Sequence, residues 1–271
     1  MGKPLIYPTI KEPQELKEFV DDAIYLTGGH LPPGVGEGSF KHSNFAHRIL
    51  NRLTTTTRFL NAAVHGTQRE KEAIFSIIHK AHTRVKGENY SADDPELHKW
   101  TAANLFAALV VVHEAFFGKL PRAKQEALYK EAAMYGTSLR MPPELWPATL
   151  DEFWQYWHRQ IETLTVTDWA RSLCRDLLWP RKIPLYLWPA VPVGRLLTIH
   201  WLPERLQREY GLPRPGPWSN AFYYSAVAGT ALIYPHLPRT LRTLPSKMYM
   251  KDMKSAVKRI EATGTWHNKK D

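Results

Sequence analysis

The stretch that decides the fold is SNFAHRILNRLTTTTRFLNAA at residues 43–63, followed by QREKEAIFSIIHKAHTRVK at residues 68–86. In both segments apolar residues recur every three or four positions, the spacing of one face of an α-helix. Only a short turn separates the segments. We therefore expect two antiparallel helices.

The rest of the chain also reads as helices, because no alternating strand pattern or hairpin dipeptide interrupts it. Further helices are expected near 12–26, 94–117, 121–136, 149–166, 167–178, 194–210, 218–231 and 246–262. The segment LLWPRKIPLYLWPAVPV at 177–193 is too rich in proline for a helix and too apolar for an exposed linker, so we expect an ordered loop packed across the helices. The sequence predicts an all-α fold in a single domain over 1–271, with a Lys-rich, mobile extension at about 246–271.

Composition narrows the class of protein. The 271 residues include ten Trp, ten Phe and twelve Tyr, more apolar surface than a disordered chain carries. A single cysteine, Cys174, excludes an internal disulfide framework. We expect a soluble, cytoplasmic protein, since we find neither a signal peptide nor a transmembrane stretch. The net charge of +10 is spread among acids, which favours a solvated surface over nucleic-acid binding.

The helix at 43–63 carries two polar residues in the middle of its apolar face. At about 100° per residue, that face is formed by Phe45, Ile49, Phe59, Leu60 and Ala63. Arg52 and Thr56 point to its middle. A buried guanidinium requires an anion, so Arg52 is expected to pair with a protein carboxylate or to hold an anionic ligand. Glu114, on the apolar helix 94–117, is one candidate carboxylate.

The helix at 68–86 places a histidine beside its own apolar stripe. The stripe consists of Ile74, Ile77, Ile78, Ala81 and Val85. His82 lies on its flank, whereas His79 is expected to turn toward the polar side. A histidine beside an apolar face is often a core residue, and that interpretation stays open. Two helices that face each other with polar groups inside apolar walls describe a binding crevice.

No familiar catalytic or metal motif occurs elsewhere in the sequence. His42 and His47 do not have metal-ligand spacing, and we find no H-E-x-x-H, nucleophile elbow or Walker loop. The glycines at 34–38 suit a turn.

Several short motifs occur in a defined order. They are His42-Ser43, R-L-x-x-T-x-x-F from Arg52 to Phe59, Gly66-Thr67, H-x-x-V-x-G from His82 to Gly87, Y-x-A-x-D-P-x-L-x-x-W from Tyr90 to Trp100, FFGKL at 116–120 and LPERLQREYGLP at 202–213. Over roughly 36–245 the chain resembles the catalytic domain of the rubber oxygenases. That family includes the latex-clearing proteins and a fungal oxygenase that shortens the farnesyl chain of a mycophenolic acid precursor.

The resemblance implies a globin-like multi-helix bundle around a central crevice that binds haem b. It also implies that His82 is the proximal ligand of the iron, with Arg52 and Thr56 on the distal side. The chain departs from the family at Thr55, where rubber-cleaving members resemble one another in having a lysine. The family's distal acid has only Glu37 as a loose counterpart, and no N-terminal membrane helix like that of the fungal relatives is found.

Together these observations predict a haem-dependent oxygenase that uses O2 on an apolar small molecule of isoprenoid or polyketide type, in secondary metabolism. A peripheral contact with membranes stays open. One alternative is an isomerase or cyclase of the same fold that uses Arg52 and His82 without haem redox chemistry. Another is a haem-binding sensor without turnover.

Overall fold

Helices are the main regular elements of the part of the chain that the structure, a computed structural model, describes. The description covers residues 45–88, 90–180 and 183–266, with only the helical backbone for residues 45–50 and 52. Within these ranges the only strand-like pairing is an isolated bridge between Lys86 and Ser91. The all-α prediction is confirmed. The helix expected at 12–26 lies outside the described residues.

Helices α3 (Phe45–His65) and α4 (Gln68–Arg84) form the predicted pair. The amide of Gly66 donates to the carbonyl of Ala62 at 3.0 Å and closes α3. Thr67 and Glu70 then cap α4 reciprocally, since the Thr67 amide donates to the Glu70 carboxylate at 2.9 Å. The turn between the helices is therefore fixed by local hydrogen bonds.

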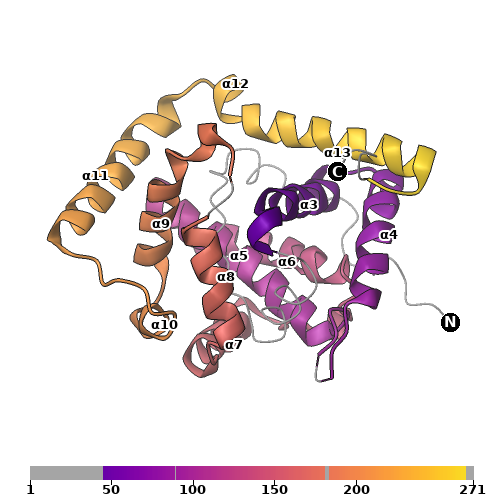
Figure 1. The fold of residues 1–271 in the computed structure, drawn as a ribbon, viewed down its shortest axis with the longest axis horizontal. Helices are drawn as coiled ribbons and strands as arrows, with labels where there is room; N and C mark the ends of the chain where they lie inside the picture. Colours follow the sequence, from indigo (N-terminus) through magenta and orange to yellow (C-terminus); the bar gives the residue numbers. More distant parts are fainter. Residues whose placement is uncertain (1–44, 89, 181–182, 267–271) are drawn as a thin grey trace.

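Helix α5 (Pro95–Phe117) runs through the middle of the molecule (Figure 1). It begins at the Asp94 cap with proline in its first turn and ends at Gly118, whose φ of 83° suits glycine. Helices α6 (Arg122–Thr137) and α7 (Leu150–Thr163), with the short η1 (Pro143–Leu145), pack around it. Phe106 of α5 lies 5.0 Å from the ring of Phe153, the centre of an aromatic core.

A second cluster gathers around Trp100 at the side of α5. It is built by α8 (Asp168–Leu178), α9 (Ala190–Trp201) and α10 (Glu204–Glu209). The prediction of a single helix at 194–210 is wrong. The helix is interrupted between α9 and α10 at Pro203, which lacks the amide hydrogen needed to continue it.

Up to Trp266 the C-terminal region packs into the fold, whereas the sequence predicted an extension from about residue 246. Helices α11 (Pro217–Ile233) and α12 (Arg239–Arg242), joined by η3 (Tyr234–His236), lead into α13 (Leu244–Thr263). Figure 1 shows α13 crossing the top of the molecule toward α4. Met253 and Ala256 are fully buried there, and Arg58 of α3 donates to the Asp252 carboxylate at 2.7 Å.

The expectation that 177–193 packs across the helices is also wrong. Residues 177–178 end α8, the short η2 (Leu185–Leu187) follows, and residues 190–193 already belong to α9, although the sequence predicted no helix there. Leu185 and Tyr186 are 83% and 78% exposed. The apolar composition of this stretch therefore did not predict how exposed its side chains are.

Candidate functional site

The α3–α4 turn brings the two helices that carry the expected site residues together. Arg52 and His82 lie 14 and 16 residues from Gly66, which is about 21 and 24 Å along their helices at 1.5 Å per residue. They therefore lie at similar distances from the turn. The side chain of Arg52 and all of Glu37 fall outside the described residues.

The threonine run of α3 buries a different residue from the one its periodicity predicts. Phe59 and Ala63 are buried, and Thr56, which lies on the same face as Ala63 two turns earlier, is exposed. Thr57 is the buried residue of the threonine run, and its hydroxyl donates to the Thr54 carbonyl at 2.9 Å. The buried side of α3 thus runs through Thr57, Asn61 and Val64, and Thr56 faces the solvent where the sequence predicted an inward position.

Helix α4 buries a different set of residues from the one its periodicity predicts. Its buried residues are Lys71, Ile74, Phe75 and His79. Ile77, Ile78 and Val85 are half-buried, and Ala81 is exposed. The buried direction is therefore rotated from the predicted stripe toward His79, because α4 packs against its neighbours through polar as well as apolar residues.

The prediction that His79 turns toward the polar side of its helix is wrong. Its ring is only 1% exposed, and Nε2 donates to the backbone carbonyl of Ser138 at 2.8 Å. Burial, reinforced by the positive charge of Arg140, lowers the pKa of His79 to about 4. His79 is therefore neutral at pH 7 and serves to tie α4 to the end of α6.

His82 lies one turn further along α4, near the end of the helix, and is half-buried. Its ring stacks on the ring of His98 with centroids 5.7 Å apart. His98 is itself fixed, because its Nε2 donates to the Ala92 carbonyl at 2.9 Å. The first turns of α5 thus support the His82 imidazole from one side.

A buried ion pair that sequence reasoning missed lies close to these histidines. Arg140 Nη1 donates to the Asp93 carboxylate at 3.0 Å, with both side chains less than a fifth exposed. Both charges act on the proton affinity of His79. No periodicity signals this contact, because Asp93 precedes α5 and Arg140 follows α6, 47 residues later.

Glu114 serves the turn between α5 and α6. Its Oε1 accepts the amide of Leu120 at 3.1 Å and lies 3.4 Å from Nε2 of Gln125. The Glu114 carboxylate therefore stabilises this turn. Across the described ranges, no three His, Cys, Asp or Glu side chains gather into a set that could hold a metal ion.

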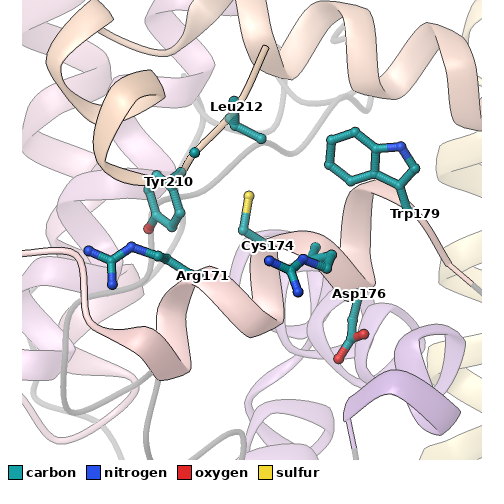
Figure 2. A pocket seen from close by; sticks show the side chains of 8 residues that line it. Arg171, Cys174, Asp176, Trp179, Tyr210 and Leu212 are labelled. Atoms are coloured by element: carbon teal, nitrogen blue, oxygen red, sulfur yellow. The ribbon is translucent and has the colours of Figure 1, made fainter.

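A cavity of about 310 Å³ is lined by residues of α8 and of the segment 210–212, with none from α3 or α4. Figure 2 shows the Cys174 thiol pointing into it toward the segment from Tyr210 to Leu212, with Arg171 and Arg175 also lining it. Burial raises the pKa of Cys174 to about 11, so the thiol is protonated and a weak nucleophile at pH 7.

Comparison with known protein families identifies the family of this chain. The family described as "ER-bound oxygenase mpaB/B'/Rubber oxygenase, catalytic domain" matches residues 23–232. The chain belongs to this family. It is an oxygenase-type catalytic domain, and the family places it among the oxidoreductases. Arg52, Thr56 and His82 all lie within the matched segment, whereas α13 lies beyond it.

Two mycobacterial proteins are similar to this member of the mpaB and rubber oxygenase family. They are uncharacterized protein Rv2237 of Mycobacterium tuberculosis and uncharacterized protein Mb2261 of Mycobacterium bovis, each 29% identical over 198 residues. The alignments cover 70% of this chain and 76% of each relative. No solved structure matches the chain significantly.

One described helix has the length and composition of a membrane span. It is α5, and half of its most apolar window is buried inside the fold.

Proposed function

We propose that this protein is a haem b-dependent oxygenase that uses O2 to oxidise an apolar small molecule of isoprenoid or polyketide type in secondary metabolism. The observation that carries the proposal is the half-buried imidazole of His82 on α4, which stacks on the fixed ring of His98 and lies within the segment that matches the oxygenase family.

The residues present fit a haem, which needs a flat apolar space, one imidazole and partners for two carboxylates. Leu53, Ile77, Ile78 and Val85 keep part of their apolar surface uncovered on the two helices. His82 would hold the iron, since the Nε2 atom of His79 is already bonded to Ser138. Arg52 would supply the cation for a haem carboxylate.

When bound, haem would supply the one-electron and O2 chemistry that amino-acid side chains lack. The chain's own residues would position the reactants. The Thr56 hydroxyl can donate a hydrogen bond to a reacting oxygen or hold a water molecule, but it is too weak an acid to move protons alone at pH 7. Apolar side chains on both helices would exclude water from the substrate.

The decisive experiment is the absorption spectrum of the protein purified with added haem. We expect a Soret band with one haem per chain, lost in His82→Ala and retained in His79→Gln. A band lost in His79→Gln and kept in His82→Ala, with both variants folded by circular dichroism, would show that the proximal assignment is wrong. A protein that never takes up haem would favour acid–base chemistry at Arg52 and His82.

Turnover separates an oxygenase from a haem sensor. With a farnesylated or other isoprenoid substrate and O2, Thr56→Val should keep its haem and lose roughly 10²–10³ in rate, as is typical when one preorganised donor is removed. An unchanged rate would mean that Thr56 only packs. Haem binding without any O2 consumption would favour the sensor.

A further inference from the structure

Helix α11 is exposed in an unusual way for a helix at the edge of a globular domain. Its sequence from Pro217 to Ile233 contains no charged residue, and none of its residues is buried. Trp218, Phe222 and Leu232 share one side of the helix, and Trp218 is 89% exposed. A surface helix ordinarily turns charged residues to the solvent, whereas α11 turns aromatic and aliphatic ones outward.

The exposed apolar surface continues onto neighbouring elements. We define the outer apolar face as Leu185, Tyr186, Trp188, Trp218, Phe222, Leu232, Ile233, Leu241, Leu244 and Met248, all of which are exposed. A few hundred Å² of contiguous apolar surface is already unusual on a monomer that binds nothing there.

Two hydrogen bonds hold α11 against α9. Nε2 of His200, near the end of α9, lies 3.1 Å from Oδ1 of Asn220, near the start of α11. Nε1 of Trp201 donates to the hydroxyl of Tyr223 at 2.9 Å. The end of α9 therefore packs against the start of α11, and η3 and α12 lead from the end of α11 to α13 (Figure 1).

The charge around the outer apolar face has one sign. The sequence contains no Asp or Glu at 177–203 or at 210–251, although both stretches contain basic residues. On α13, four exposed lysines follow one another at the spacing of a single helix face: Lys247, Lys251, Lys254 and Lys258. We call these four residues the lysine stripe.

We propose that the outer apolar face and the lysine stripe dock this protein peripherally on an anionic lipid bilayer, with α11 lying in the plane of the interface. Exposed Trp and Tyr beside Lys and Arg is the composition that membrane interfaces favour. A second copy of the chain fits less well, because a symmetric contact would set one lysine stripe near another, and the acids of α13, Asp252 and Glu261, are already paired with Arg58 and Arg69. The proposal does not rest on haem binding or on turnover.

Vesicle sedimentation tests the proposal on the full chain. Vesicles of phosphatidylcholine with 30% phosphatidylglycerol should bind the protein, and pure phosphatidylcholine should bind it at least tenfold more weakly. The double variant K251E/K254E should lower binding by at least about 25-fold, since each cation near an anionic surface contributes about fivefold. The matched control K119E/K130E changes the net charge equally on other exposed positions and should lower binding no more than twofold.

The variant W218S/F222S tests the apolar part and should lower binding at least tenfold with an unchanged thermal midpoint, since both side chains are exposed. Wild-type binding by W218S/F222S, or no sedimentation of the parent protein with either vesicle, would overturn the proposal. So would a lipid-free dimer that W218S/F222S converts to monomer, because the face would then belong to a second copy.

Discussion

The buried, neutral His79 makes the stability of this protein depend on pH in a way that one substitution removes. The unfolded chain takes up a proton on this imidazole below about pH 6.5, whereas burial delays protonation in the folded chain to about pH 4. Protonation between these values therefore favours the unfolded state. The contribution of His79 is intact above pH 6.5 and is lost as the pH falls toward 4.

The size of this effect follows from the two pKa values. A tenfold difference in proton affinity corresponds to about 1.4 kcal/mol. The difference between 6.5 and about 4 thus amounts to roughly 3 kcal/mol of unfolding free energy. In His79→Gln this pH-dependent contribution disappears, while the amide N–H of glutamine can still donate to the Ser138 carbonyl.

Urea denaturation of parent and variant at a series of pH values from 7.5 to 4 measures the difference directly. The parent should lose about 3 kcal/mol more than His79→Gln across this range. The matched variant His79→Phe should share the flatter dependence but start about 1–3 kcal/mol lower, because it strands the Ser138 carbonyl. Parallel curves for parent and His79→Gln would refute the reasoning.

Three further expectations concern packing and reactivity. Met253→Ala should lower the free energy of unfolding by about 2–5 kcal/mol in urea denaturation, because Met253 is fully buried. Met248→Ala, on the exposed side of the same helix, should change it by no more than about 0.5 kcal/mol, and equal effects would show that α13 does not belong to the core. Gly66→Ala should lower the thermal midpoint, since the new Cβ would lie 2.5 Å from the Ala62 carbonyl oxygen, and an unchanged midpoint would mean that the turn relaxes freely. Cys174 should react slowly with a disulfide reagent at pH 8 and faster toward pH 11, and rapid labelling at pH 8 would contradict its burial.

Capping residues predicted the helix starts where they occur. Asp94 and Thr149 cap α5 and α7 as their sequence context indicates, and the motif Gly66-Thr67 lies at the turn between α3 and α4. Each of these features depends on hydrogen bonds between residues a few positions apart, so the sequence alone contains the information.

The orientation of side chains was harder to predict, because it depends on what each helix packs against. The apolar stripe of α4 suggested a polar environment for His79, but the Ser138 carbonyl from the end of α6 compensates for the burial of that ring. The stacking of His82 on His98 depends on how α5, which carries His98, packs against α4. Burial of α13 and exposure of Leu185 likewise follow from tertiary contacts that periodicity does not report.

The ion pair between Arg58 and Asp252 joins residues 194 positions apart, and this separation has a consequence for how the chain is made. Ribosomes add about 5–20 residues per second, so α3 emerges roughly 10–40 s before the helix that covers it. During that interval the α3–α4 pair stays without its last neighbour, with apolar surface open to solvent. Synthesis of the final helix therefore completes the packing of the first described one.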